Sequence, residues 1–326
     1  MLTLFESLPL ITQNMIVLLV VVFLKVLLTK ISPSLKQQAI FTFYRFYCLQ
    51  LAAKVNKEAN SHTQQKVAGF IATVITIAPL VIIVWLFEAF IVVPVIWQAL
   101  LLFIALGAFN LNSIGSSIAK ALSSQDKYQA KQLISPWLSR DTEQLSPIGI
   151  NKACIEMLLI RKLQQHFIVG FYFIFLGPLA ALTFRLLLET HYSWNIKQHQ
   201  FVFFGRFINK TVNILQWLPS RLFLILLMFT SINQPILLFW RLLKSHFLKV
   251  NNNMLIGYLA YVLEIKLGGV AMYSKNKVRR IAFNDKGHQP EINDIHSAIK
   301  QLNLVMTLAL GLLVSIIIVI AILVNH

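Results

Sequence analysis

The C-terminal part of the sequence contains an unbroken run of uncharged residues, LNLVMTLALGLLVSIIIVIAILV at 302–324. With a rise of about 1.5 Å per residue, a helix over this run is roughly 34 Å long. That length is enough to cross the hydrocarbon core of a bilayer, which is about 30 Å thick. The run therefore predicts a transmembrane helix and requires a fold that is built in a membrane.

Other apolar segments make the chain polytopic. Residues 69–109 contain a single charge, Glu88, which suits a hairpin of two spanning helices. Only 13% of all residues are charged, against roughly a quarter in soluble domains. The sequence predicts an all-α, polytopic helical bundle in one membrane domain, residues 1–326, with amphipathic helices on its cytoplasmic side. The six expected spans are residues 7–29, 69–88, 90–110, 167–188, 222–243 and 302–324.

The first apolar segment is predicted to be a retained span rather than a signal peptide. Its only early charge is Glu6, so it lacks a basic n-region, and no small-x-small cleavage site follows it. Lys25, near the C-terminal end of this segment, is expected to extend its ammonium group to the lipid headgroups.

The formal net charge of +17 is concentrated between the predicted spans, in segments 30–66, 111–165 and 244–301. The positive-inside rule places these three segments in the cytoplasm and both termini outside. The charge therefore indicates topology and contact with membrane lipids, rather than binding of nucleic acid. The expected location is the inner membrane of a bacterial cell, as a multi-pass protein. The sequence does not define an oligomeric state.

One connecting segment fits this topology poorly. The span count places 189–218 outside, although it carries Lys197, Arg206 and Lys210. An interfacial or re-entrant helix is the alternative for this segment, since polar backbone at membrane depth is tolerated where protein shields it.

Two cytoplasmic segments are predicted to be helical. In 114–133 the apolar residues follow a helical stripe with polar residues opposite. Ser146 and Pro147 form a typical helix start, so a second helix is expected from Pro147 to about Leu163. The polar segment SRDTEQLS, residues 139–146, then connects two helices at the membrane edge.

No metal ligands can be assigned from the sequence. The eight histidines are dispersed, and neither they nor Cys48 and Cys154 have the spacing of metal ligands. Both cysteines are expected in the cytoplasm or the membrane, where a disulfide is not expected. The sequence also lacks a P-loop, a nucleophile elbow, a kinase signature and a Rossmann fingerprint.

Several short motifs occur in a fixed order over roughly residues 100–300. They are R-D-T at 140–142 with Glu156 on the following helix, Gly177-Pro178 with Arg185, Gly205 with WLPSRL at 217–222, LEIKLGGVAMY at 263–273, and Gly287 with PEINDIHSAI at 290–299. In order and spacing these motifs resemble the CobD/CbiB family of membrane proteins in cobalamin biosynthesis.

This resemblance implies an ATP-dependent amide ligase of the adenosylcobinamide-phosphate synthase type. Such an enzyme joins a corrinoid propionate to aminopropanol or its phosphate, with ATP and Mg²⁺ as cofactors. The resemblance marks Asp141 and Glu156 as catalytic. It marks as substrate-binding Arg140, Thr142, Arg185, Arg221, Gly268, Gly269 and Tyr273.

The sequence departs from the family pattern where the family has further acidic residues. Three segments correspond to acidic motifs of the family. The first contains Ile160, Arg161, Gln164 and Gln165, and the other two are residues 188–192 and 210–213. AmpE, a membrane protein linked to β-lactamase induction, looks like a degenerate relative of the same superfamily. It also lacks these acidic motifs, and it ends in a very apolar span similar to residues 302–324 of this chain. The alternative hypothesis is therefore a non-catalytic membrane regulator or sensor of AmpE type, and a transporter is a more distant third.

Several of these residues also have a structural interpretation. Arg140 and Asp141 would form a local ion pair between two helix ends. Glu156 lies on an apolar helix, so it should face the bundle interior or pair with Lys152 or Arg161.

The arginines and glycines further along the chain have the same two interpretations. Arg185 and Arg221 flank uncharged spans and are predicted to anchor at the headgroup boundary, with binding of an anionic substrate as the alternative. Gly268 and Gly269 are too short a motif for a phosphate loop and are predicted to allow a positive φ or close packing.

Overall fold

The structure is a computed structural model that describes residues 7–31, 39–231, 251–273 and 276–325. Its main helices are α2 (Leu10–Ile31), α3 (Ala39–Val55), α4 (His62–Glu88), α5 (Pro94–Ala105), α6 (Leu111–Ser123), α7 (Lys127–Ile134), α8 (Pro147–Lys162), α9 (Ile168–Ser193), α10 (Arg206–Phe229), α12 (Asn251–Val262) and α13 (Ile292–Asn325). Short helical turns cover Ser135–Trp137, Leu163–Phe167 and His199–Phe201, and two strands, β1 (Leu267–Tyr273) and β2 (Asn276–Phe283), pair antiparallel. The predicted fold class, an all-α polytopic membrane bundle, is confirmed.

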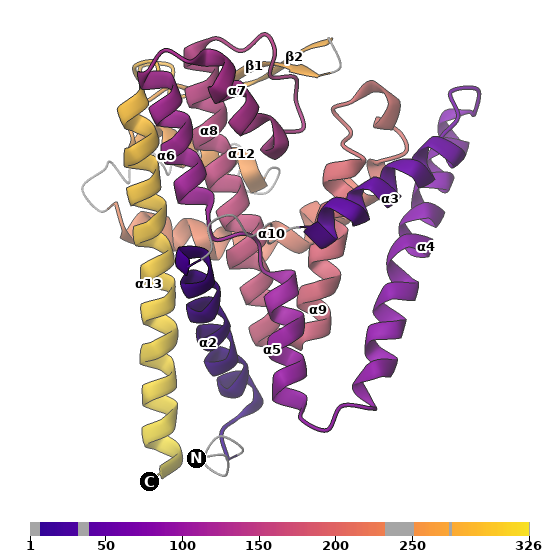
Figure 1. Cartoon of the computed structure of the whole chain (residues 1–326), viewed down its shortest axis with the longest axis vertical. Helices are drawn as coiled ribbons and strands as arrows, with labels where there is room; N and C mark the ends of the chain where they lie inside the picture. The colour runs from indigo at the N-terminus through magenta and orange to yellow at the C-terminus, as the bar shows by residue number, and fades with distance from the viewer. Residues whose placement is uncertain (1–6, 32–38, 232–250, 274–275, 326) are drawn as a thin grey trace.

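Within the described residues, five helical segments are long and apolar enough to cross a membrane, and α5 is a shorter apolar helix. The most apolar window of α13 is not buried by the rest of the chain. α13 runs along the outer edge of the bundle to its C-terminal end (Figure 1). Bare apolar surface of this kind is stable only against lipid, which agrees with the span predicted over 302–324.

The centre of the bundle is α8 together with the start of α9. Leu158, Leu159, Leu163, Ile168 and Val169 are all fully buried there. The five-residue turn Leu163–Phe167 between the two helices is a π-helix. Such π-helical turns are rare and frequently mark functional positions.

α9 is a helical hairpin rather than one straight span. Gly177 has φ 84° and ψ −176°, which breaks the helix immediately before Pro178. The rings of Tyr172 and Phe184 stack at 5.2 Å, although residues twelve apart in a straight helix are separated by about 18 Å. The segment 168–176 therefore descends into the membrane, and the segment 178–193 returns alongside it. We call these the first and second limbs of α9.

This hairpin contradicts the prediction of a single span over 167–188. The sequence pattern records only that the segment is apolar, and a chain reversal at one glycine does not interrupt that pattern. The second limb has 16 residues and is about 24 Å long, which is shorter than the bilayer's hydrocarbon core. The hairpin is thus re-entrant and brings residue 193 back to the side on which α8 begins.

The segment after the hairpin packs against the connection between α3 and α4. Asn56 Nδ2 donates to Gln200 O at 2.6 Å, and the His62 ring stacks on Phe203 at 3.9 Å. Trp194 Nε1 also donates to the Cys48 carbonyl at 3.0 Å. Residues 194–205 therefore lie on the same side as segment 30–66, not on the opposite side as the span count predicted.

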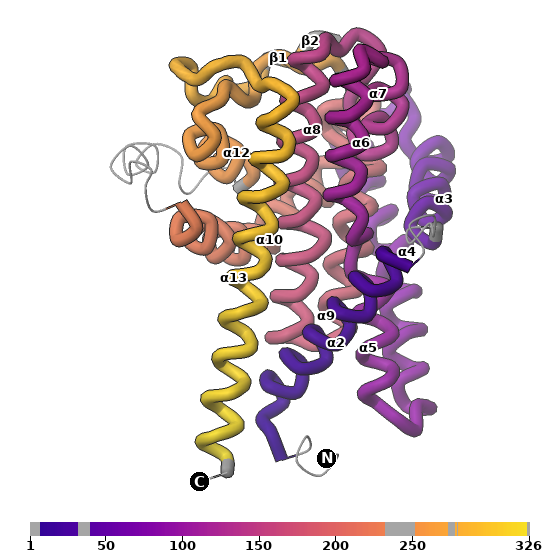
Figure 2. Tube along the Cα trace, turned by 60° about the vertical axis from the view of Figure 1, so that its left-hand side comes forward, coloured from indigo at the N-terminus to yellow at the C-terminus, as the bar shows by residue number. Residues whose placement is uncertain are grey.

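α10 runs across the bundle in both views, at a steep inclination to α13 (Figures 1 and 2). One face of α10, which includes Ile208, Val212, Gln216, Phe223 and Leu227, is buried. Trp217, Leu218 and Phe229 on the opposite side are exposed. α10 joins the end of the predicted connection 189–218 to the start of the predicted span 222–243 in one helix. The rest of that span, 232–243, lies outside the described residues.

Both segments predicted to be helical on the cytoplasmic side are helical in the structure. Segment 114–133 is split into α6 and α7 by Gln125, which has φ 60°, and Asp126 caps α7 through Gln129 N. α8 begins at Pro147 as predicted, with the Ser146 hydroxyl accepting from Gly149 N at 3.1 Å. The segment SRDTEQLS does connect two helical elements. The hairpin of β1 and β2 was not predicted.

Lys25 does not reach the headgroups. It is 1% exposed, and its Nζ donates to the carbonyls of Leu106 and Gly107 at 2.7 and 3.3 Å. These carbonyls follow the end of α5 and have no partner within that helix, so a lysine from α2 satisfies them. The ammonium also lies 4.6 Å from the centre of the Phe103 ring.

Candidate active site

Glu156 is the centre of a buried ionic cluster on α8. Arg280 Nη1 lies 3.0 Å from Glu156 Oε2, and Arg140 Nη2 lies 3.7 Å from the same oxygen. Gly268 N donates to Glu156 Oε1 at 3.0 Å, and Arg280 Nη2 approaches that oxygen at 3.3 Å. Glu156 is 5% exposed, so these contacts replace most of the water around its carboxylate.

The prediction that Glu156 faces the interior and pairs with a cation is therefore right, but the predicted partners are wrong. Arg161 instead donates to the Trp137 carbonyl at 2.8 Å. Lys152 is one turn from Glu156 on α8. The ion pairs of Glu156 are instead with Arg140, in the loop before α8, and Arg280, on β2. Arg140 was predicted to form a local ion pair with Asp141. In the structure its guanidinium pairs with Glu156 instead.

The R-D-T loop is held against β1 by its backbone. Asp141 N donates to Met272 O at 3.0 Å, and Leu145 N donates to Thr142 O at 3.2 Å in the turn before α8. Asp141 and Thr142 are half-buried. The loop thus places Arg140 beside Glu156. Tyr273 is the last residue of β1, and its side chain is not part of the described structure.

Gly268 and Gly269 form an irregularity in the β1–β2 pairing, with φ of 74° and 87°. The left-handed backbone turns Gly268 N towards Glu156. A Cβ on Gly268 would lie 2.2 Å from Ile281 O, whereas one on Gly269 would meet nothing within 4 Å. The predicted positive φ is confirmed for both glycines, and close packing applies to Gly268 alone. Arg280 Nε also donates to Gly269 O at 3.3 Å, which fixes its guanidinium over the bulge.

The cluster carries more positive than negative charge. Two guanidiniums, of Arg140 and Arg280, contact the carboxylate of Glu156, and Lys152 lies within electrostatic range of it. Guanidinium groups bind carboxylates and phosphates through paired hydrogen bonds. The cluster therefore suits a bound anion.

The same side chains do not suit a protein-held Mg²⁺. Magnesium takes oxygen ligands in octahedral geometry, usually with one or two free carboxylates. Both Glu156 oxygens are already occupied by donors. Within the described ranges, no three His, Cys, Asp or Glu side chains gather into a potential metal site.

Arg185 belongs to a second buried cluster, on the second limb of α9. Its Nη2 lies 2.7 Å from Glu189 Oε1, and Arg45 Nε reaches Glu189 Oε2 at 2.5 Å. The guanidinium of Arg185 also lies 4.4 Å from the Phe41 ring centre, and the residue is completely buried. The predicted anchoring of Arg185 at the headgroups is therefore wrong, because α3 covers it.

Arg221 is also not a headgroup anchor. It is 6% exposed, and its Nη1 donates to Trp217 O at 2.5 Å, one turn earlier on α10. Its guanidinium lies 4.2 Å from the Trp217 ring centre.

Residues from two of the segments that depart from the family's acidic motifs meet in a neutral hydrogen-bond network. Tyr192 OH donates to Gln164 Oε1 at 2.5 Å, and Gln164 Nε2 donates to Gln216 Oε1 at 3.1 Å. The Arg161 guanidinium lies 4.1 Å from the Tyr192 ring centre. The hairpin of α9 brings these residues together. Residues that do not match the family's acidic motifs therefore form a packed polar cluster in the structure.

Arg280 is the main site residue that sequence reasoning missed. It appeared only as part of the dense basic stretch in 244–301. The available signal was a basic residue eleven positions after a Gly-Gly motif, in a region where a short hairpin was not considered.

The fold and the cluster define a polytopic membrane protein with a buried, arginine-rich ionic cluster at one end of the bundle. The CobD/Cbib protein family model matches residues 41–302, and the chain belongs to this family. This range contains Arg140, Glu156, Gly268 and Arg280, and it confirms the family resemblance seen in the motifs.

Three relatives illustrate the similarity. The cobalamin biosynthesis protein CobD of Chromobacterium violaceum is 26% identical over 240 residues, 74% of this chain and 77% of the relative. CobD of Stutzerimonas stutzeri is 25% identical over 231 residues, 71% and 76% of the two chains. The probable cobalamin biosynthesis protein CobD of Pyrococcus abyssi is 22% identical over 207 residues, 64% and 66%. No solved structure matches the chain.

Proposed function

We propose that this protein acts in cobalamin biosynthesis and forms an amide bond between a corrinoid carboxylate and aminopropanol or its phosphate. We place it in the bacterial inner membrane, in contact with lipid. Family membership and the names of the relatives support this function. The observation that carries it is the Glu156 cluster, in which two separate motifs of the family resemblance meet Arg280 of β2.

Within this proposal, Arg140 and Arg280 bind the anionic part of a substrate. A carboxylate or phosphate oxygen placed between the two guanidiniums would receive charge-assisted hydrogen bonds. Glu156 acts as a positioning residue, because its oxygens hold both arginines and the Gly268 amide. Without its charge, two like charges would be left side by side at a partly buried site.

ATP is the proposed source of activation, since it would convert the carboxylate into an acyl phosphate that an amine can attack. The new C–N bond then forms as the C–O bond to phosphate breaks and inorganic phosphate leaves. The cationic side chains of the cluster suit phosphate groups. We assign no step to a protein-bound metal, because donors already occupy both oxygens of Glu156.

Complementation tests this function. A cobalamin-producing bacterium that lacks its own amide-forming synthase is given this chain and grown on the incomplete corrinoid. Growth is expected with the wild-type chain. With Arg280→Gln and with Glu156→Gln we expect at least tenfold less amidated corrinoid, because a lost charge-assisted hydrogen bond costs about 1.5–3 kcal/mol and 1.4 kcal/mol is tenfold.

Lys120→Gln is the matched control, since it removes a positive charge from an exposed position on α6 and should leave product formation unchanged. Membrane levels of every variant are measured by immunoblot. Failure of the wild-type chain to restore growth, despite its presence in the membrane, would contradict the proposal and favour the non-catalytic alternative of AmpE type.

A further inference from the structure

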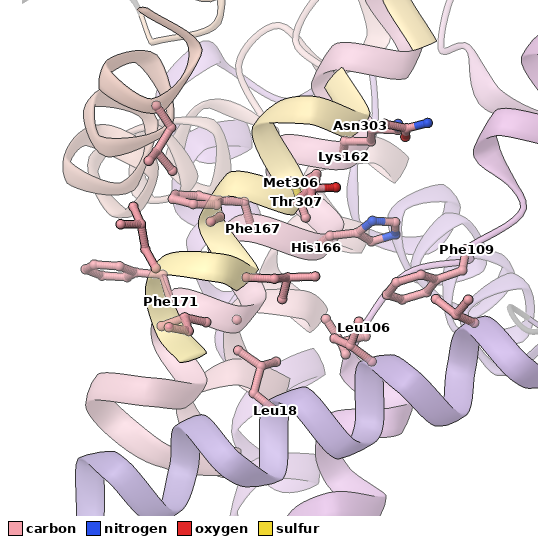
Figure 3. A pocket seen from close by; sticks show the side chains of 18 of the residues that line it. Leu18, Leu106, Phe109, Lys162, His166, Phe167, Phe171, Asn303, Met306 and Thr307 are labelled. Carbon is pink, nitrogen blue, oxygen red and sulfur yellow. The ribbon is translucent and has the colours of Figure 1, made fainter. Parts of the chain in front are cut away.

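A cavity of about 780 Å³ lies between α2, the first limb of α9, α10 and α13 (Figure 3). It is separate from the Glu156 cluster, and none of the residues assigned to substrate binding lines it. Most of its wall is apolar, with Leu18, Phe167 and Phe171 among the lining side chains.

The polar lining residues are all at one end. On α13, Asn303 lines the cavity first and is followed by Met306, Thr307 and apolar residues as far as Ile316. On the chain from α8 into α9, Lys162 and His166 come first and the phenylalanines follow. α2 runs the opposite way, and there Thr29 and Lys30 come last. Three helices therefore present polar groups at the same end, nearest the β1–β2 side of the molecule (Figure 1).

The charge at this end is positive. Lys30 and Lys162 line it, and no Asp or Glu is among the lining residues. Lys162 Nζ donates to Asn303 Oδ1 at 2.6 Å, and Asn112 Nδ2 donates to the same oxygen at 3.0 Å. These bonds hold the Lys162 ammonium at the rim of the cavity, where it can meet an anion.

The other end is open towards lipid. Phe175 is 54% exposed and Ile316 is 43% exposed, so the described chain leaves the apolar end uncovered. From Asn303 to Ile316 the cavity follows α13 for roughly 20 Å. A slot of this length, apolar along its walls and positive at one end, has the form of an acyl chain attached to an anionic headgroup.

We propose that this cavity binds one anionic phospholipid. Its phosphate lies between Lys30 and Lys162, and one acyl chain lies along α13 between α2 and the first limb of α9. The positive-inside rule puts the polar end of the cavity at the cytoplasmic face, so the lipid comes from that leaflet. A headgroup phosphate supplies the negative charge that the lining lacks, and the chain covers apolar surface that faces the membrane.

Native mass spectrometry of the full-length protein in neutral detergent tests this proposal. Dioleoylphosphatidylglycerol and dioleoylphosphatidylcholine are added in parallel, so that the two lipids differ in charge but not in chains. We expect one phosphatidylglycerol to be retained. Retention should weaken by about fivefold for each of Lys30→Gln and Lys162→Gln. Lys120→Gln should have no effect.

Leu310→Trp fills the apolar part of the cavity and should reduce retention of phosphatidylglycerol while both lysines are intact. Equal retention of the two lipids by the wild-type protein, or unchanged retention in Lys162→Gln, would overturn the proposal. Displacement of phosphatidylglycerol by cobinamide would also overturn it and would assign the cavity to a corrinoid.

Discussion

At the scale of single residues, sequence reasoning predicted what a buried charge needs but not which group provides it. Glu156 was expected to pair with a cation on its own helix, and its partner is Arg280, 124 residues further along the chain. Lys25 was expected to reach the headgroups, and it instead satisfies carbonyls 81 and 82 residues away. Periodicity describes neighbours on one helix, so partners brought by tertiary packing lie outside its reach.

Gly268 and Gly269 allow a matched test of the β1 irregularity. Both have positive φ, but only Gly268 faces the backbone of β2. Gly269→Ala should lower the free energy of unfolding by about 1–2 kcal/mol, the cost of the left-handed conformation. Gly268→Ala adds a clash with Ile281 O and should lower it clearly further. Thermal unfolding in detergent measures both, and equal losses would contradict the close approach seen at Gly268.

At the scale of elements, helix starts were the most predictable feature and chain reversals the least. Ser146 and Pro147 carry a local signal for the start of α8, because the capping atoms and the helix they cap are adjacent in sequence. Gly177 and Pro178 were noticed as a motif, but a kink and a full reversal have the same local composition. The contacts of Tyr172 with Phe184 distinguish the two, and these depend on the folded chain.

Cysteine cross-linking tests the reversal at Gly177. The double variant Tyr172→Cys and Phe184→Cys should form a disulfide on mild oxidation, because the two rings are 5.2 Å apart in the hairpin. The control pair Leu304→Cys and Ile316→Cys has the same twelve-residue separation within the continuous helix α13, where it corresponds to about 18 Å. That pair should not form an intramolecular disulfide. Mass spectrometry of proteolytic peptides identifies the cross-link, and a straight α9 would give none in either pair.

At the scale of the whole molecule, the re-entrant hairpin changes the topology that the charges predict. A single span over 167–188 would place Lys197, Arg206 and Lys210 on the opposite side from the other basic segments. In the structure the second limb of α9 brings this segment back beside α3, and the first residues of α2 and the last residues of α13 lie at the other end of the bundle (Figures 1 and 2). The basic segments then share one side, which is what the positive-inside rule favours. The all-α class could be predicted from composition. The side of the membrane on which the segment after α9 lies could not, because it depends on whether α9 crosses the membrane or turns back at Gly177.

The sidedness of Lys197 decides between the two topologies. Lys197→Cys should react with a membrane-impermeant maleimide from the same side as Lys120→Cys and from the opposite side to Glu88→Cys. All three positions are exposed. Intact cells and inverted vesicles give access to the two sides in turn. We expect Lys197→Cys and Lys120→Cys to label in inverted vesicles and Glu88→Cys in intact cells.

The native cysteines permit this experiment without a cysteine-free background. Cys48 and Cys154 are fully buried, and burial raises the pKa of the Cys48 thiol to about 11. At pH 7.5 the Cys48 thiol is protonated and unreactive, because the thiolate is the nucleophile. The wild-type chain should therefore remain unlabelled. Labelling of Lys197→Cys in intact cells, together with Glu88→Cys, would restore the single span over 167–188 and remove the re-entrant hairpin on which the common side of the basic segments depends.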